Sequence, residues 1–115
     1  MSWTLKVRDK FSAAHYLVGY RGKCERVHGH TFHVEIEVVV RELDGTGIGI
    51  DFTELKKSLA AALPDHVLLN EVFPFNPSAE NIARHLYGEL KKAYQVRAVT
   101  VWESDDASAT YAEDD

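Results

Sequence analysis

The chain has 115 residues, which is enough for one domain with a modest hydrophobic core, and we expect residues 1–115 to form that single domain. With 45% hydrophobic and 27% charged residues and a formal net charge of −5, the composition argues against a membrane span and against a general nucleic-acid-binding surface. A single cysteine excludes an internal disulfide, so we expect a reducing, cytoplasmic location without membrane or nucleic-acid partners.

Two long segments near the N-terminus alternate between apolar and polar residues with the period of a half-buried strand. In residues 3–15 the odd positions are mostly apolar, and Asp9 is the exception that suggests a β-bulge. In residues 28–40 the even positions are apolar or histidine. A glycine-containing loop joins the two segments, so we expect them to pair as an antiparallel hairpin.

The middle of the chain favours two helices separated by a loop. Asp51 and Glu54 have the spacing of a helical capping box, and an apolar stripe follows them until Pro64 ends the helix. Residues 65–77 are rich in proline, and we expect a loop there. Ser78 can cap a second helix, which has an apolar face formed by Ile82, Leu86, Tyr87, Leu90 and Tyr94.

The C-terminal part of the chain favours two further strands. Residues 96–103 are rich in β-branched side chains, and residues 107–111 show a weaker strand pattern. The resulting order is ββααββ. It predicts an α+β fold in which two helices cover one face of an antiparallel sheet.

Three histidines would converge at one end of the predicted hairpin. His28 and His30 are two residues apart in a strand, so both side chains leave the face that continues into the core. His15 ends the first strand on its own apolar face, whereas His33 points to the opposite face. Three neutral imidazoles with a fourth position left open are the ligand set of a catalytic Zn²⁺. Hydrogen-bonded structural histidines are the alternative.

Two further features could take part in proton transfer. Cys24 lies in a loop with Lys23 and Arg26, where a nearby cation or metal could lower the pKa of the thiol. The alternative is an inert, buried cysteine. Asp65 and His66 are adjacent and could orient each other, although Asp-His pairs are also common on protein surfaces.

These residues belong to a series of motifs that resembles the family of 6-pyruvoyl-tetrahydropterin and 6-carboxy-tetrahydropterin synthases. The motifs run along the whole chain, and they are FSAAH (11–15), CxxxHGH (24–30), IDFTELK (50–56), DHVLLN (65–70), NPSAEN (76–81) and WES (102–104). The resemblance implies a tunnelling fold (T-fold), in which ββααββ subunits form a trimeric β-barrel and two trimers stack as a hexamer. We therefore expect a homo-oligomer, either a trimer or a hexamer.

The resemblance also implies roles for individual residues. The implied zinc ligands are His15, His28 and His30. Cys24 becomes the catalytic base, and Asp65 and His66 complete a proton relay from a neighbouring subunit. Glu103 resembles the pterin anchor of the family, because a carboxylate can accept two hydrogen bonds from the adjacent amino and N–H groups of the ring.

The spacing of the cysteine motif resembles that of the bacterial 6-carboxy type. Three residues separate Cys24 from His28. The implied enzyme is a zinc-dependent lyase that converts 7,8-dihydroneopterin triphosphate into 6-carboxy-5,6,7,8-tetrahydropterin, a precursor of 7-deazaguanines such as queuosine. The nearest basic candidates for binding the triphosphate are Arg21, Lys23 and Arg26.

Glu25 leaves the product open. It lies three residues before His28 and resembles variants in which a glutamate takes part or all of the role of the cysteine. In those variants the product can be 6-hydroxymethyl-7,8-dihydropterin. A 6-pyruvoyl product is a further alternative, and a catalytically silent zinc- or pterin-binding module is the alternative from outside the enzyme class.

Overall fold

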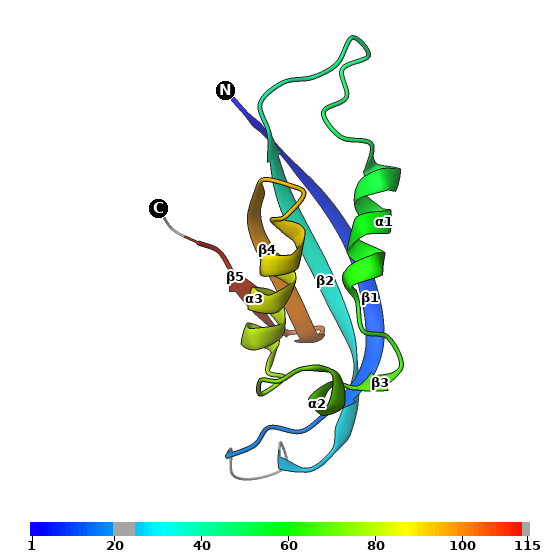
Figure 1. The fold of residues 1–115 in the computed structure, drawn as a ribbon, viewed down its shortest axis with the longest axis vertical. Coiled ribbons are helices and arrows are strands. Elements are labelled where there is room, and N and C mark those ends of the chain that lie inside the picture. Colours follow the sequence, from blue (N-terminus) through cyan, green and yellow to red (C-terminus); the bar gives the residue numbers. More distant parts are fainter. Residues whose placement is uncertain (20–24, 114–115) are drawn as a thin grey trace.

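A hairpin of two long strands forms the centre of the computed structural model, which describes residues 1–19 and 25–113. The strands are β1 (Trp3–His15) and β2 (His28–Val40). They pair antiparallel along their whole length, from Trp3 opposite Val40 to His15 opposite His28 (Figure 1). Both strand predictions are confirmed, because the two-residue period that identifies them in the sequence is the period of their burial.

The expected bulge at Asp9 is wrong. Asp9 pairs with Val34 in an uninterrupted register. Asp9 is half-buried, and its carboxylate accepts a hydrogen bond from the backbone N–H of Lys10 at 2.8 Å, so it has a polar partner without an extra residue in the strand. The described sheet has register shifts elsewhere, between Glu37 and Val38, where β2 pairs with β4, and between Trp102 and Ser104, where β4 pairs with β5.

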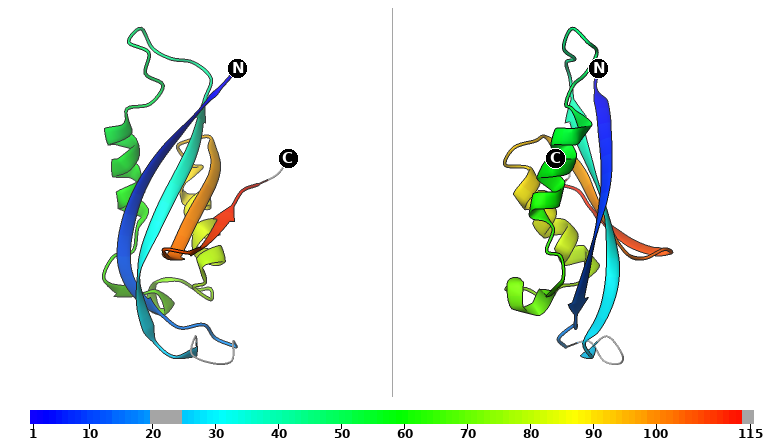
Figure 2. Two further views of the ribbon diagram at one scale, coloured as in Figure 1. Left: turned by 180° about the vertical axis from the view of Figure 1, so that it is seen from behind. Right: turned by 90° about the vertical axis from the view of Figure 1, so that its right-hand side faces the viewer.

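Three more strands complete a five-stranded sheet in the order β3-β1-β2-β4-β5. Strand β4 (Val96–Ser104) is antiparallel to β2, and β5 (Ala107–Tyr111) is antiparallel to β4. The very short β3 (Val67–Leu68) is parallel to the end of β1. Figure 2 shows the long, twisted sheet from behind and edge-on.

Helices α1 (Phe52–Ala62) and α3 (Ala79–Leu90) cover the same face of the sheet, as predicted (Figures 1 and 2). Both predicted caps are present, because Asp51 accepts the N–H of Thr53 at 2.8 Å and Ser78 accepts the N–H of Asn81 at 3.1 Å. The α+β order ββααββ is confirmed, with two short additions in the expected loop.

Those additions are β3 and the four-residue helix α2 (Leu69–Val72). The expectation of an irregular loop over residues 65–77 is therefore wrong for its first half. Segments this short have no detectable period, and the pairing of β3 depends on the position of β1, which is remote in the sequence.

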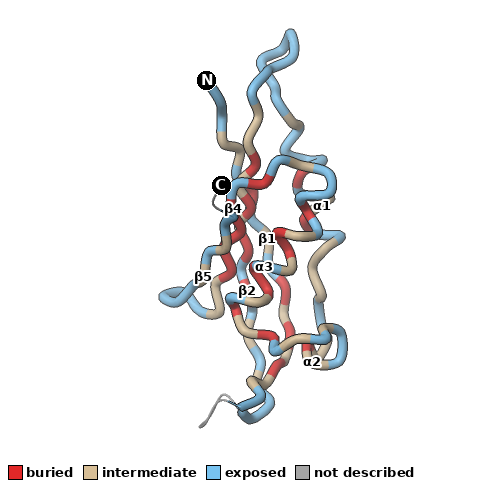
Figure 3. The backbone as a smooth tube through the Cα atoms, turned by 60° about the vertical axis from the view of Figure 1, so that its left-hand side comes forward, coloured by how far each residue is buried: buried red, intermediate tan, exposed pale blue. Residues whose placement is uncertain are grey.

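The core lies between the helices and one face of the sheet (Figure 3). It is formed by the odd positions of β1, the even positions of β2 and the apolar face of α3, with Phe11 stacked on Phe32 at a ring distance of 4.9 Å. The other face of the sheet is polar. There Arg8 pairs with Glu35 at 2.7 Å and lies 4.8 Å from the ring of Trp102. Among the described residues, no helix is long and apolar enough to cross a bilayer.

Candidate functional site

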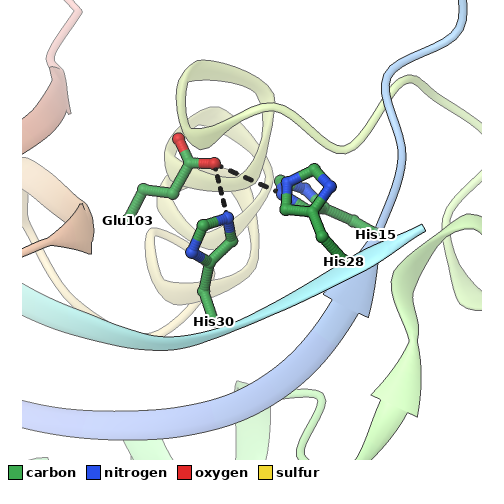
Figure 4. A group of neighbouring side chains, drawn as sticks. All are labelled: His15, His28, His30 and Glu103. Carbon is green, nitrogen blue, oxygen red and sulfur yellow. Dashed lines mark ion pairs between the residues drawn. The ribbon is translucent and has the colours of Figure 1, made fainter. Parts of the chain in front are cut away.

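Three imidazoles from two strands meet at one end of the hairpin (Figure 4). His15 and His28 face each other as the last register pair of β1 and β2, and His30 follows two residues further along β2. The ring centroids are 4.6 Å apart for His15 and His28, 4.8 Å for His28 and His30, and 5.2 Å for His15 and His30. The structure thus brings together the three residues that the strand period places on one face.

The outer nitrogens of two of these rings are held by backbone carbonyls. Nδ1 of His15 lies 2.7 Å from the carbonyl oxygen of Pro77, and Nδ1 of His28 lies 2.7 Å from that of Arg26. Because a carbonyl can only accept a hydrogen bond, each Nδ1 carries the proton. The lone pair of each Nε2 is therefore free to bind a metal ion, and the carbonyl fixes both the tautomer and the ring orientation.

Glu103, near the end of β4, adds a carboxylate to the group. Its Oε1 lies 2.9 Å from Nε2 of His30 and 3.3 Å from Nε2 of His15. Among the described residues, neither buried Nε2 has a hydrogen-bond partner, so these short approaches lack the geometry of a hydrogen bond. The ligand atoms of His15, His28, His30 and Glu103 all lie within 4.8 Å of one another, and the group could hold a metal ion.

The electrostatics of the group favour a bound cation. His15 is completely buried. The pKa of His30 is lowered, mainly by burial and also by the neighbouring His15 and His28, and these effects together exceed the opposite effect of Glu103, which raises this pKa. Neutral imidazoles that direct lone pairs at one another and at a carboxylate repel unless a cation lies between them. Nitrogen and oxygen donors of this kind fit Zn²⁺.

Asp65 and His66 form a dyad on the edge of β1. Oδ2 of Asp65 accepts a hydrogen bond from Nδ1 of His66 at 2.8 Å, and Oδ1 accepts the backbone N–H of Ser12 at 2.8 Å. The N–H of His66 donates to the carbonyl oxygen of Ser12 at 2.6 Å. Two hydrogen bonds lower the pKa of Asp65, and the one from Ser12 has a larger effect than the one from His66. Both residues are thus fixed to the sheet just before β3 begins.

The dyad faces outwards. The side chain of His66 is 81% exposed, and its backbone has a φ of 56°, in the left-handed region that few non-glycine residues adopt. An open, shallow hollow of about 650 Å³ lies beside it and is lined by short stretches of β1 and β2 as well as by residues 66–68. The candidate metal group does not include either member of the dyad.

The remaining predicted site residues lie in the loop between β1 and β2. Glu25 and Arg26 are exposed, and the carbonyl of Arg26 is the one that holds His28. The predicted base Cys24 lies outside the described residues, as do the basic candidates Arg21 and Lys23.

Two asparagines that sequence reasoning treated only as parts of motifs hold the chain just after β1. The side-chain amide of Asn70 accepts the N–H of Tyr16 at 3.0 Å and donates to its carbonyl oxygen at 2.9 Å. Asn76 makes the same pair with Val18, at 2.9 and 3.1 Å. An amide side chain thereby replaces the peptide group of a partner strand. One sequence alone gives no signal that would pair these distant positions.

Comparison with known proteins decides the family. A family model described as 6-pyruvoyl tetrahydropterin synthase matches residues 4–114. The chain belongs to this synthase family. The expected family membership is confirmed, and with it the tunnelling fold of the subunit, because solved structures of the family superpose on almost the whole chain.

Several relatives of the synthase family are similar over most of their length. A protein from Archaeoglobus fulgidus is 40% identical over 103 residues, which cover 87% of each chain. The 6-carboxy-5,6,7,8-tetrahydropterin synthase of Synechocystis sp. is 32% identical over 119 residues, 95% of this chain and 92% of the other. The structure of Caenorhabditis elegans 6-pyruvoyl tetrahydropterin synthase has a TM-score of 0.85 at 27% identity and covers 99% of this chain and 97% of its own.

A more distant structure of the family shares the fold. It is a Plasmodium vivax 6-pyruvoyltetrahydropterin synthase in which a catalytic glutamate has been replaced by alanine. Its TM-score is 0.70 at 21% identity, with 98% of each chain covered.

Proposed function

We propose that this chain is a zinc-dependent 6-carboxy-5,6,7,8-tetrahydropterin synthase that acts on 7,8-dihydroneopterin triphosphate. The observation that carries the proposal is the convergence of three imidazoles, two of them oriented by backbone carbonyls, in a chain whose relatives include a synthase of this name. The residues that would hold zinc are His15, His28 and His30. Zinc bound there would polarise the oxygens of the substrate side chain and acidify the neighbouring C–H bonds.

The proton transfers would belong to the protein. Cys24 is the proposed base, since a thiol near a metal and basic residues can ionise near neutral pH. His66 would accept and return protons through Nε2, because its Nδ1–H is held by Asp65. The exposed position of this imidazole supports a role in the site of a neighbouring subunit rather than in its own.

Substrate binding would use a carboxylate for the pterin ring and basic side chains for the triphosphate. Glu103 is the proposed anchor of the pterin ring, because its carboxylate can accept the amino and N–H hydrogens together. Arg26 is exposed beside the histidine group and is a candidate for the triphosphate. Arg21 and Lys23 stay candidates from the sequence alone.

A homo-oligomer would follow from the open edges of the sheet. In the described residues, β3 covers β1 only at Ala13 and Ala14, and β5 forms the other edge of the sheet. Edges of this kind are prone to pair with another strand. We propose that copies of the chain join edge to edge into a trimeric barrel, with a hexamer formed from two trimers.

The proposal is tested by incubating the purified protein with 7,8-dihydroneopterin triphosphate and identifying the products by mass. We expect release of triphosphate and a 6-carboxy product. The protein should carry about one zinc per chain. The double change His28→Ala/His30→Ala should remove it, whereas His33→Ala, on the opposite face of β2, should not. Zinc retention by the double variant, or absence of turnover by the zinc-loaded wild type, would contradict the proposal.

A second candidate product is 6-hydroxymethyl-7,8-dihydropterin. It is favoured by Glu25, an exposed carboxylate next in sequence to the proposed base Cys24. The two products differ in mass, so the same incubation distinguishes them. A silent binding module would bind the pterin and form neither product.

A further inference from the structure

We propose that Glu103 is a fourth, displaceable ligand of the metal, which closes the metal site until a pterin ring draws its carboxylate away. The inference rests on the proposed function and adds a step to it. In this reading one carboxylate has two alternative partners, the metal and the ring. The ring must bind before the metal has a free position for the substrate side chain.

The contacts of Oε1 support the first partner. This single oxygen approaches two imidazole nitrogens, at 2.9 Å for His30 and 3.3 Å for His15. Since the proton of His15 is on Nδ1, its Nε2 has no hydrogen to offer, and the contact of lone pair with lone pair is repulsive. An oxygen that points at the common centre of three histidines has the position of a fourth ligand (Figure 4).

The contacts of Glu103 place its side chain on the face of the sheet that carries the histidines. It lies where the pairing of β4 with β5 is irregular, between Trp102 and Ser104. It is also close to the end of β4, where the side chain is still 32% exposed. The carboxylate therefore lies at the border between the buried His15 and the surface.

A second position for the carboxylate is available. Glu103 lines a hollow of about 190 Å³ together with Glu80 and residues 107–109 at the start of β5. In this reading, rotation about the side-chain torsions of Glu103 would move the carboxylate from the histidines to this hollow. A planar ring that donates two hydrogens to the carboxylate would use both oxygens and leave none for the metal.

Competition for one carboxylate has a measurable consequence. If the metal and the ring both require it, each must weaken the binding of the other, and by the same factor. A bare pterin without a side chain isolates this effect, because it can engage Glu103 without supplying the side-chain oxygens that would compensate the metal.

The first test measures zinc affinity by competition with a chromogenic chelator. Glu103→Gln and Glu103→Ala should bind zinc at least about tenfold more weakly than the wild type. Glu80→Gln removes the same charge from the same hollow and should change the affinity less than about threefold. Wild-type affinity in both Glu103 variants would overturn the inference, even if the wild type forms the 6-carboxy product. Weakened binding in both, without any turnover by the wild type, would support ligation and contradict the proposed function.

The second test measures the affinity of bare pterin by calorimetry for the zinc-free and the zinc-loaded wild type. We expect zinc to weaken pterin binding by at least about fivefold, and saturating pterin to weaken zinc binding by an equal factor. Equal affinities, tighter binding to the zinc form, or no binding to either form would overturn the displacement.

Discussion

At the scale of single residues, Asn76 supports the proposed metal ligand His15 from a distance. Its side chain holds both backbone groups of Val18, and its own carbonyl accepts hydrogen bonds from the N–H of Ser78 and from Nδ2 of Asn81, each at 2.9 Å. The next residue is Pro77, whose carbonyl orients the ring of His15. The position of that carbonyl therefore depends on Asn76.

We expect Asn76→Ala to weaken zinc binding by about tenfold, because a carbonyl that is less well fixed orients His15 less well. It should also destabilise the zinc-free protein by about 1–2 kcal/mol through the loss of two hydrogen bonds. Asn70→Ala is the matched control, since it breaks the same pair with Tyr16 but has no link to Pro77. Chelator competition and urea unfolding measure both quantities. An equal loss of zinc affinity in the two variants would contradict this role of Asn76.

Under the proposed function, the roles of Cys24 and Glu25 as proton-transfer groups decide which product forms. An exposed carboxylate is a weaker general base than a thiolate held near a metal ion and basic residues. We expect Cys24→Ala to lose turnover by at least about a hundredfold and Glu25→Gln to stay within about tenfold of the wild type. Rate and product mass for both variants on one substrate decide the matter. An inactive Glu25→Gln beside an active Cys24→Ala would establish the hydroxymethyl product instead.

The three histidines could be predicted from the sequence because a strand alternates its side chains strictly. No such period identifies Glu103, because the pairing of β4 with β5 is irregular between Trp102 and Ser104, and its contact with the histidines depends on where β4 lies beside β2. That position is set by tertiary packing and by the register shift after Glu37, which have no local signature in the sequence.

At the scale of elements, the segment that contains β3 is tied to β1 by a carboxylate. The pKa of Asp65 is lowered from its ordinary value of 3.8, chiefly by the hydrogen bond from the N–H of Ser12 and to a smaller extent by that from the imidazole of His66. Because the folded state has the lower pKa, ionised Asp65 stabilises the fold above pH 3.8. That contribution is lost as the pH falls through the lower, folded-state value.

Asp65→Asn should test this link, because asparagine keeps an oxygen for the N–H of Ser12 but cannot titrate. We expect the wild type to be more stable than the variant at neutral pH, with a difference that shrinks below pH 3.8 and then vanishes. Urea midpoints of the zinc-free protein from about pH 6 to about pH 2.5 measure it. Asp105→Asn, at an exposed turn, is the control. A difference that stays constant over this range would show that the carboxylate does not act by titration.

The elements differ in how far the sequence determines them. The two long strands and the two capped helices carry ten or more residues of periodic pattern, and the strands and α1 are predicted with nearly their observed ends. The predicted second helix includes Tyr94, which is wrong, because α3 ends at Leu90 and the chain turns before Tyr94. By contrast, β3 and α2 have two and four residues, and they form because Asp65 and Asn70 bind to β1 and to the residue after it. Such contacts join positions more than fifty residues apart.

At the scale of the whole molecule, the elongated subunit has a large polar sheet face and two open edges. Its principal extents are 53 × 30 × 26 Å, and the helices cover only one side of the sheet (Figure 2). Edge pairing between copies would bury the free backbone groups of β1 and β5 and turn the polar face towards the inside of a barrel.

We expect light scattering of the purified protein to give the mass of a trimer or a hexamer. Alternate residues of an edge strand direct their N–H groups inwards and outwards, so Ser108→Pro and Ala109→Pro should behave differently. The variant whose lost N–H faces β4 should have a less stable fold. The variant whose lost N–H faces away from β4 should stay folded but should show a smaller oligomer mass in light scattering. A fully active wild-type monomer would exclude the barrel.

The pairing of His15 with His28 has a consequence for the motions of the hairpin. These residues are the final pair of the two strands, and the pairing of β1 with β2 ends there. A metal ion bound to both would cross-link the strands at the point where fraying begins. Removal of the metal should therefore loosen the hairpin from this end. Backbone amides at 13–15 and 28–30 would then exchange their hydrogens with solvent much earlier than those at the middle of the same strands.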